Sequence, residues 1–354
     1  MANNSQSTSQ DPLGRSRAEI GMEVTLATLV CLASTLGNLL VVYVINKDIR
    51  LKSVTIIFIQ NLALTDISMA TLHMPFWVVS VYTGTWNFSE SWCEVSASIQ
   101  FTLGMASILN MGLIALNRYI RVVKPALYSK LFASDKKARF YCLLVWLIAM
   151  LLATPPLYGW GKMAYHSKFF VCTFNWQVKY ISYAILTVGG VVNGVTTAIF
   201  YCYYKIYKTV KISTQNMNAR EEEHGVSTSN SRPTDMKLLK TSFTVVCVFL
   251  MTWGPVSIVV IIESAGCLIP REVCIVVIYL MFSSSLANSI IYGIMNPQFK
   301  LAFKKAVSCG RYCNENINRS HTENRTRTTD ANVQEEMGRR CSVHQSTLIV
   351  EKSV

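Results

Sequence analysis

Two charged side chains interrupt the apolar stretches of this chain, and each could do chemistry there. Asp66 lies in the otherwise uncharged run 54–83, and a carboxylate at that depth in a membrane span marks a functional site by default. It is either protonated and packed, or ionised and paired with a cation. Serine and amide oxygens in other apolar runs would suit a hard cation such as Na⁺. The candidate ligands beside Asp66 are Ser107, Ser284, Ser285 and Asn288.

Arg118, within Asn117-Arg118-Tyr119, lies where the uncharged run 95–117 meets a basic segment. An arginine at such a boundary can be a positive anchor on the cytoplasmic side of a membrane. It can also be a buried switch residue whose partners depend on conformation. No catalytic constellation accompanies these charges, because the five histidines are scattered through loops, outer span ends and the tail. We therefore do not expect an enzyme.

The composition indicates a polytopic membrane protein. Of the 354 residues, 51% are hydrophobic and only 15% are charged, whereas soluble domains carry about 25% charged residues. Seven apolar stretches are each long enough to cross the hydrocarbon core, and in lipid they must be helical to pair their backbone groups. The predicted fold class is an all-α bundle of seven membrane-spanning helices. The stretches are 24–45, 54–83, 95–117, 140–161, 180–204, 241–262 and 273–295.

The basic residues between the spans predict the orientation. One set of connections holds 17 lysines and arginines and the opposite set holds 4, so the first set faces the cytoplasm. Residues 1–19 then form an extracellular tail, and they lack the apolar core of a cleavable signal peptide. The net charge of +13 reflects this asymmetry and does not call for nucleic-acid binding. We expect a multi-pass plasma-membrane protein with its C-terminus in the cytoplasm.

Four cysteines fall on the predicted outer side, where disulfides can form and persist. Cys93 begins the third span and Cys172 lies in the next outer connection, so a bond between them would tie that loop to the helix. Cys267 and Cys274 bracket the last outer connection, and the six residues between them permit a second disulfide without requiring it. Two N-glycosylation sequons fall on the same side, at Asn3 and Asn87.

The sixth span contains a predicted hinge. Pro255 follows Trp253-Gly254 inside the apolar run, and an internal proline removes a backbone donor and kinks the helix. The inner half of this helix can then swing. Asp235 precedes Trp253 by 18 residues, about 27 Å of helix, which reaches the inner surface. We predict an ion pair between Asp235 and Arg118 that favours a closed inner face.

The cytoplasmic segments divide into a loop, a short helix and a tail. A polar stretch at about 210–235 reads as a flexible loop between the fifth and sixth spans. After the seventh span, Phe299, Ala302 and Phe303 recur at helical spacing beside lysines, which predicts an amphipathic eighth helix on the inner leaflet. The bundle with this helix occupies 20–308, and 309–354 is a disordered tail. The candidate palmitoylation sites are Cys309 and Cys313.

The chain resembles rhodopsin-like (class A) G-protein-coupled receptors from about Glu23 to Cys313. Three positions depart from the family pattern: Asn117 replaces an acid before Arg118, Ser289 replaces the proline after Asn288, and Val195 occupies the proline position of the fifth helix. The matching positions are Asn38, Asn61-Leu62-Ala63-x-x-Asp66, Cys93 with Cys172, Asn117-Arg118-Tyr119, Trp146, Trp253-x-Pro255 and Asn288-x-x-x-Tyr292.

Some motifs resemble one subgroup of the family and some resemble another. Asn117-Arg118-Tyr119 and the proline-less Asn288–Tyr292 motif are similar to melatonin receptors, whereas Gly159-Trp160-Gly161 looks more like opsins. The acid that binds protonated amines in this family is replaced by Gln100, and the lysine that binds retinal in opsins is replaced by Phe282. The resemblance therefore implies a neutral, aromatic or lipid-like ligand and no covalent retinal. The implied pocket is Gln100, Met105, Trp253, Tyr279 and Phe282.

The resemblance also implies a mechanism and partners. An extracellular small ligand would bias the sixth helix near Trp253 and open a cytoplasmic cleft beside Arg118 for a heterotrimeric G protein. The melatonin-like features imply the inhibitory class, arrestin is a further expected partner, and Na⁺ at Asp66 would be a negative modulator. Tyr203 and Tyr292 would contact Arg118. The alternatives are an opsin-like receptor without the Schiff-base lysine, and a seven-helix transporter or channel with Asp66 as its ion relay, although no internal repeat supports the latter.

Overall fold

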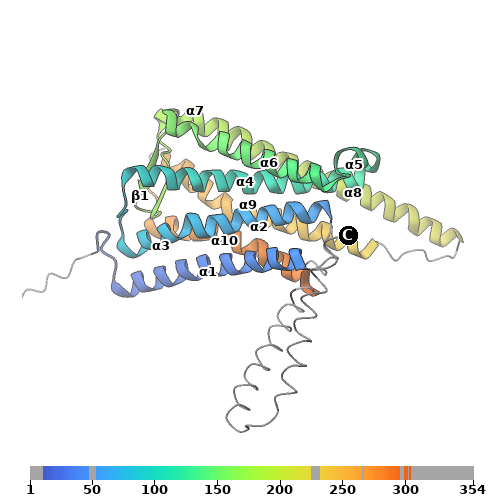
Figure 1. The fold of residues 1–354 in the computed structure, drawn as a ribbon, viewed down its shortest axis with the longest axis horizontal. Coiled ribbons are helices and arrows are strands. Elements are labelled where there is room, and N and C mark those ends of the chain that lie inside the picture. The colour runs from blue at the N-terminus through green and yellow to red at the C-terminus, as the bar shows by residue number, and fades with distance from the viewer. Residues whose placement is uncertain are drawn as a thin grey trace, which may run out of the picture. The chain divides into compact units, whose positions relative to one another are not determined.

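The computed structural model describes residues 11–47, 53–224, 232–264, 267–295, 299–301 and 303, with backbone alone at 178, 216–224, 232–240, 242 and 264. Within these residues, seven helices or helix pairs are long and apolar enough to cross a membrane (Figure 1), so the predicted all-α seven-span fold is confirmed. The helices are α1 (Arg17–Lys47), α2 (Val54–Leu72), α3 (Met74–Thr83), α4 (Glu90–Val123), α5 (Pro125–Leu131), α6 (Asp135–Ala153), α7 (Ile181–Ala184), α8 (Asn193–His224), α9 (Arg232–Ser264) and α10 (Arg271–Met295).

Capping residues and prolines define where several helices begin and end. Ser89 caps α4 by accepting a hydrogen bond from the backbone N–H of Trp92 at 3.1 Å, which satisfies one unpaired donor of the first turn. The second span is interrupted at His73, because Pro75 in the first turn of α3 cannot donate to the preceding turn. Pro155 likewise begins a separate 3₁₀ turn, Pro155–Tyr158, after α6 ends.

The fifth span differs from expectation at both ends. A π-helical turn, Ile185–Val192, lies between α7 and α8, in the part of the span that precedes the missing proline at Val195. Such turns recur at functional sites because they widen the helix locally. At the inner end, α8 continues to His224 and α9 begins at Arg232. The described residues of the expected loop at about 210–235 are therefore helical, and the glutamates at 221–223 near the end of α8 favour helix.

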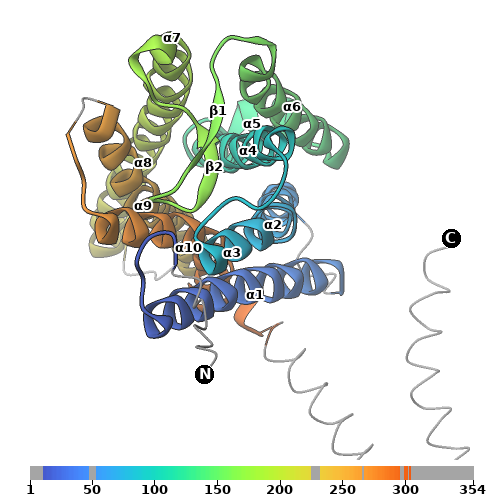
Figure 2. The same ribbon diagram turned by 90° about the vertical axis from the view of Figure 1, so that its left-hand side faces the viewer.

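A two-stranded hairpin covers the outer end of the bundle. Strands β1 (Met163–His166) and β2 (Val171–Phe174) pair antiparallel, with Met163 opposite Phe174, and Figure 2 shows them lying across the middle of the ring of helices. The predicted disulfide Cys93–Cys172 is present and ties β2 to α4.

The second disulfide is absent from the structure. Cys267 and Cys274 are both free thiols. Cys267 is exposed in the connection, whereas Cys274 is buried in the first turn of α10, 4.0 Å from the carboxylate of Glu263. The helical turn points the Cys274 side chain into the bundle and away from the loop, so sequence spacing alone was a poor guide.

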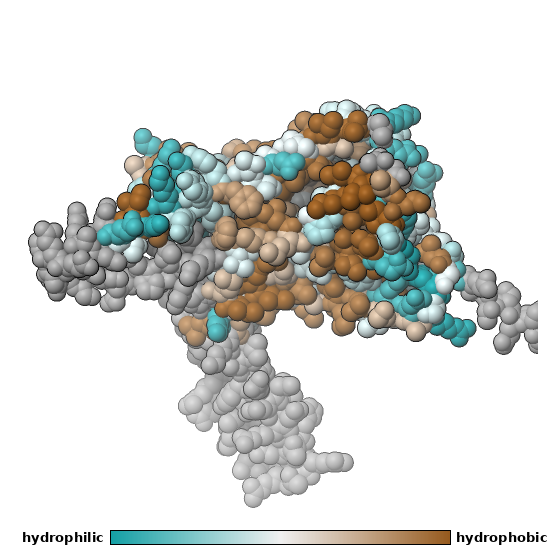
Figure 3. Space-filling model, turned by 180° about the vertical axis from the view of Figure 1, so that it is seen from behind, coloured by the Kyte–Doolittle hydropathy of each residue, from teal (hydrophilic) through white to brown (hydrophobic). Residues whose placement is uncertain are grey.

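The residues exposed around the circumference of the bundle are of the kind that contacts a lipid bilayer. Long apolar side chains are exposed along the outward faces of the helices, including Leu36 on α1 and Leu151 on α6. Figure 3 shows hydrophobic residues over the middle of one face and hydrophilic residues toward both ends. Exposed apolar area of this extent is rare on soluble monomers, so this surface is a lipid-facing one.

Candidate functional site

The intramembrane carboxylate lies in a polar group shared by α2 and α10. Asp66 is 2% exposed and accepts a hydrogen bond from the side-chain amide of Asn288 at 2.9 Å. The hydroxyl of Ser285 also hydrogen-bonds to it. Ser107 on α4 and Ser284 on α10 are buried as well. Four of the five predicted residues are thus on the facing sides of two helices.

This donor set fits a monovalent cation better than a divalent one. Within the described residues no group of three or more His, Cys, Asp or Glu side chains could hold a metal ion, so Asp66 would supply the only carboxylate. Neutral serine and amide oxygens would complete the shell, which is the hard-ligand type that alkali and alkaline-earth cations prefer. If bound, a Na⁺ ion would be held by Asp66, the serines and Asn288.

Hydrogen bonds connect this polar group to the neighbouring helices. The indole N–H of Trp253 on α9 donates to the Ser284 hydroxyl at 3.0 Å, next to Ser285. The side-chain amide of Asn38 on α1, one of the family-matching positions, donates to the Ser285 carbonyl at 2.9 Å and so ties α1 to α10. A change at Trp253 is therefore one hydrogen bond away from the Asp66 group.

An aromatic cluster forms the candidate ligand site above Trp253. The ring of Phe282 lies 4.4 Å from that of Trp77 and 5.6 Å from that of His73, and Tyr279 lies 4.9 Å from Trp77. Trp253 packs against the same buried cluster. Three of the predicted pocket residues are thus brought together, and His73 and Trp77 were missed because their apolar-run positions carry no local signal of which face they occupy.

Gln100 adds a polar atom to this site. Its side chain is buried, and its carbonyl oxygen has no hydrogen-bond partner among the described residues. One turn further along α4, a Cβ at Gly104 would lie 2.8 Å from the Trp253 ring. Gln100 and Gly104 share a helix face because they are four residues apart. Gln100 therefore lies one turn outward from the point where Trp253 meets α4.

The structure does not bring the predicted pocket residue Met105 together with the Trp253 cluster. Met105 packs in a separate cluster with Val145 and Ala149 of α6. An α-helix turns about 100° per residue, so the neighbour of Gly104 points to a different side of α4. The residue of α4 that approaches Trp253 is Gly104, whose lack of a side chain makes room for the indole.

The buried position of Arg118 favours its switch role over a surface anchor. Arg118 is 6% exposed, whereas an anchoring arginine would extend into the interface. The neighbouring Asn117 is fully buried and accepts a hydrogen bond from the Thr55 hydroxyl at 2.8 Å. Its side-chain amide has no hydrogen-bond partner among the described residues. Asn117 therefore ties α4 to α2, and an unpaired donor remains beside Arg118.

The other predicted switch residues lie at the inner end of the helices. Tyr203 and Tyr292 are buried, and Tyr203 packs edge-on against Phe243 of α9 at 5.3 Å. Tyr119 instead faces α8, 6.2 Å from Tyr201. Pro255 lies inside α9 as predicted. The predicted Asp235 partner of Arg118 lies outside the residues whose side chains are described.

The modification sites are only partly within the described chain. Asn87 is exposed in the connection before α4, and Asn3, Cys309 and Cys313 lie outside the described residues. Of the expected eighth helix, 299–301 and 303 are helical. Phe299 is buried and lies 5.9 Å from the ring of Tyr292.

A charged cap at the outer end is a feature that the sequence did not predict. The guanidinium of Arg15 bonds to Asp11 at 2.8 Å and Glu23 at 2.7 Å. It also donates to the Val81 carbonyl at 2.6 Å. The Arg15 side chain is only 1% exposed, and its hydrogen bonds to Asp11 hold the pKa of that carboxyl down at about 2.

A second arginine joins this cap from α10. Arg271 bonds to Glu23 at 2.5 Å, across 248 residues of sequence. The ring of Phe170, at the turn of the hairpin, lies 4.8 Å from the guanidinium of Arg15 and 5.5 Å from that of Arg271. Tyr279, a ligand-site residue, donates to the Glu23 carbonyl at 2.6 Å. The cap therefore joins the N-terminal segment, the hairpin and the ligand site.

Comparisons with known proteins agree with this architecture. Residues 37–292 match the family model described as 7 transmembrane receptor (rhodopsin family). The chain is 27% identical to human visual pigment-like receptor peropsin, over 87% of this chain and 91% of that one. It is also 27% identical to mouse melatonin receptor type 1A, over 77% and 76% of the two chains.

Two further matches extend this picture. The chain is 30% identical to melanopsin of Branchiostoma belcheri over 78% of its own length, but spans only 41% of that melanopsin. The crystal structure of squid rhodopsin superposes with a TM-score of 0.71 at 24% identity, covering 83% of this chain and 87% of that one. That structural likeness concerns the fold.

Proposed function

Because the chain belongs to the rhodopsin family of seven-transmembrane receptors, we propose that it is a plasma-membrane receptor for a neutral, aromatic or lipid-like small molecule. The observation that carries this ligand class is the chemistry of the site. Gln100, which is buried, stands where amine receptors of the family have an acid. Phe282, which stands where opsins have the retinal-binding lysine, lies in the aromatic cluster. A protonated amine would lack a counter-ion there, and retinal would lack its covalent attachment point. An uncharged ring system fits both facts.

The residues of this site would support recognition by one polar contact and aromatic packing. The unpaired carbonyl of Gln100 would accept a hydrogen bond from a ligand N–H or O–H group, and leaving such an atom unpaired costs about 1–3 kcal/mol. The rings of Trp77, Tyr279 and Phe282 would stack on the ligand, as aromatic pairs do at centroid separations of about 4.5–7 Å. An indole or a small planar aromatic amide has both properties.

Transmission starts at Trp253, which is both the floor of this site and a donor to Ser284. The Trp253 ring also stacks on Phe249 one turn inward, at 5.4 Å. Displacement of Trp253 would disturb both contacts at the hinge created by Pro255. The ligand shifts the open–closed equilibrium only by its difference in affinity for the two states. The outcome is a cleft at Arg118 that a heterotrimeric G protein enters.

The likeness to a melatonin receptor supports inhibitory G proteins as the coupling class and arrestin as a second cytoplasmic partner. The receptor would be oriented with its N-terminus outside, as the distribution of basic residues indicates. The ion pair between Asp235 and Arg118 would favour the closed state. Na⁺ at Asp66 would do the same, because it would hold α2 and α10 in their present contact.

The test is a G-protein activation panel on the expressed receptor with an indole and neutral-metabolite library. An active small molecule should be at least tenfold less potent on the Gln100→Leu variant. Its buried donor would lose its acceptor there, which costs about 1.4 kcal/mol or more. Met105→Leu is the matched control, because Met105 is on the same helix but packs against α6. Activation by peptides alone, or equal potency in both variants, would contradict the proposal.

A second candidate is a receptor that uses retinal without a covalent bond. The similarity to peropsin over most of both chains favours it. Receptor purified with added retinal would then carry the absorption band of the free aldehyde, and this band would separate from the protein on acid denaturation, because no Schiff base forms. Absence of any retinal-dependent band would remove this candidate.

A further inference from the structure

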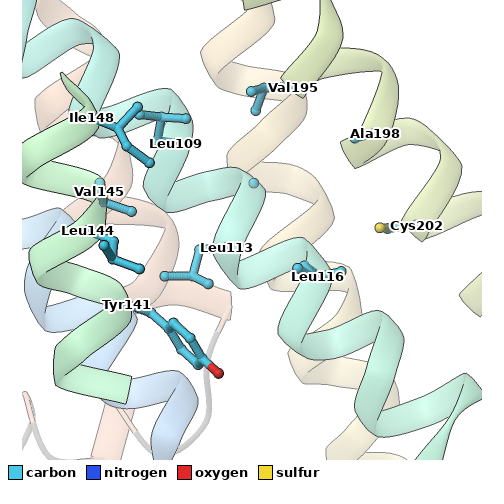
Figure 4. A pocket seen from close by; sticks show the side chains of 11 residues that line it. Leu109, Leu113, Leu116, Tyr141, Leu144, Val145, Ile148, Val195, Ala198 and Cys202 are labelled. Carbon is cyan, nitrogen blue, oxygen red and sulfur yellow. The ribbon is translucent and has the colours of Figure 1, made fainter. Parts of the chain in front are cut away.

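A groove of about 350 Å³ opens on the lipid-facing side of the bundle between α4, α6 and α8. Figure 4 shows its walls: Leu113 and Leu116 on α4, Tyr141 and Ile148 on α6, and Ala198 and Cys202 on α8. Leu116 and Ile148 are both nearly half exposed, so the groove faces away from the bundle interior. It is separate from the cluster of Trp253 and Phe282.

The groove exists because small residues lie at its floor. A Cβ on Gly112 would be 2.9 Å from a methyl group of Val195, so α4 and α8 approach closely at this level. Ala198, one turn further along α8, adds no bulk. The larger side chains on either side then stand above the floor. Gly112 is therefore required by the helix packing, and the hollow is built into the contact between α4 and α8.

The depth of the groove places it in the inner half of the membrane. Its α4 wall ends at Leu116, two residues before Arg118, and Tyr141 lies six residues after the start of α6 at Asp135. Both of these helix ends are cytoplasmic by the distribution of basic residues. From Tyr141 to Ile148 the wall rises about 10 Å. An apolar groove at this depth is exposed to acyl chains and not to water.

The cytoplasmic end of the groove carries a polar and cationic rim. The Tyr141 hydroxyl donates to the Leu131 carbonyl at 3.2 Å, and exposed Lys137 lies one turn before Tyr141 on the same face of α6. The Lys137 ammonium donates to the Lys130 carbonyl at 2.6 Å. Lys137 therefore continues the α6 wall of the groove into the interface.

The α4 and α8 walls end in the same way. Tyr119 and Tyr201 lie 6.2 Å apart and bridge the two helices. Lys124 lies 6.0 Å from the Tyr119 ring, and Lys205 lies 5.4 Å from the Tyr201 ring. Between 118 and 139 the sequence has seven basic residues and one acid, Asp135. The rim is thus strongly positive and aromatic, as membrane interfaces favour.

We propose that this groove binds an anionic glycerophospholipid of the inner leaflet, with one acyl chain against Ala198 and the phosphate at Lys137 and Lys205. The apolar walls match the chain, and the lysines match the negative headgroup. A sterol would fill the groove but would leave the cationic rim without a counter-charge. Free phosphate would pair with the cationic rim but would leave the apolar walls uncovered. Apolar walls together with a cationic rim require a lipid that has both an acyl chain and a negatively charged headgroup.

The test is native mass spectrometry of the full chain with added dioleoyl phosphatidylserine or dioleoyl phosphatidylcholine. Ala198→Phe fills the groove from an exposed position and should reduce phosphatidylserine binding at least threefold. Thr197→Phe is the matched control, since it adds the same ring on the neighbouring face of α8, and should bind as the unsubstituted chain does. An unchanged melting temperature for both variants shows that they are folded.

The headgroup contact is tested separately. Lys137→Gln with Lys205→Gln should abolish the preference for phosphatidylserine over phosphatidylcholine, about a tenfold change or more, because each lysine near an anionic surface contributes measurably. Lys47→Gln, on the inner end of α1, is the control and should keep the preference. Equal phosphatidylserine binding in Ala198→Phe and Thr197→Phe would overturn the proposal. So would a preference unchanged by the double lysine variant, or displacement of the lipid by a sterol.

Discussion

Replacing Arg15 by methionine should open the outer cap. Methionine keeps the apolar stem and removes the charge that bonds to Asp11, Glu23 and the Val81 carbonyl. Breaking a buried ion pair by removing one partner costs about 3–5 kcal/mol. Arg271 still compensates Glu23 at 2.5 Å, so the lower end of that range, about 3 kcal/mol, is expected.

A loss of that size would appear first as local opening. The backbone N–H groups of Leu13 and Arg15 both donate to the Asp11 carboxylate at 3.0 Å. Hydrogen exchange of a peptide covering 12–18 should accelerate about 100-fold in Arg15→Met, since about 1.4 kcal/mol corresponds to tenfold. Exchange on the inner half of α4 should not change.

The control is Arg17→Met, which removes an exposed cation from the first turn of α1 without touching the cap. It should leave the exchange rate of the same peptide within about twofold, because exposed charges contribute little. Equal exchange in the two variants would refute the reasoning, because it would mean that the buried arginine does not hold the segment. So would acceleration confined to residues outside 11–23.

The remaining predictions concern the two intramembrane charges and the pH response of the cap. Asn117→Asp should lower basal G-protein activation by up to about tenfold, since a charged hydrogen bond to Arg118 is worth ~1.5 kcal/mol or more; a rise would contradict this. Asp235→Ala should raise basal activation at equal surface expression; no change would argue against that ion pair. Agonist affinity should fall when NaCl replaces KCl, and Asp66→Asn should abolish this difference; a salt-insensitive unsubstituted receptor would remove the Na⁺ site. The pKa of Asp11 is lowered from 3.8 to about 2, so its stabilising contribution is present above pH 3.8 and is lost as the pH falls through 2. Cap hydrogen exchange, corrected for intrinsic rate, should therefore rise on acidification over that window in the unsubstituted chain but not in Arg15→Met.

Much of the fold could be predicted because the bilayer imposes simple constraints on sequence. A span must be about 20 apolar residues long and its backbone must be helical, so the seven stretches map onto the helices directly. Real interruptions of the spans lie at Pro75 and Pro155, since proline acts on its own backbone. The cytoplasmic loop was less predictable, because helix extension from α8 to His224 depends on weak propensities.

The candidate site was predictable where residue type alone determines the chemistry. Asp66 was recognisable because an acid in hydrocarbon is costly wherever its partners are, and the structure places Asn288 beside it. The packing of Met105 against α6 was not predictable, because an apolar residue in a span gives no sign of which helix face it occupies. The spacing of Cys267 and Cys274 left their pairing open, and only the burial of Cys274 in α10 showed it to be a free thiol.

The sequence by itself determined the number and length of the spans and the family of the protein, and it predicted their orientation and the outer disulfide. These depend on local composition and on residue types at set positions along single helices. Only the tertiary structure decided that Gly104 and not Met105 approaches Trp253, that Arg15 and Arg271 share Glu23, and that a groove lies between α4, α6 and α8. Those features depend on the rotation and close packing of helices that are distant in sequence, which no single stretch of residues specifies.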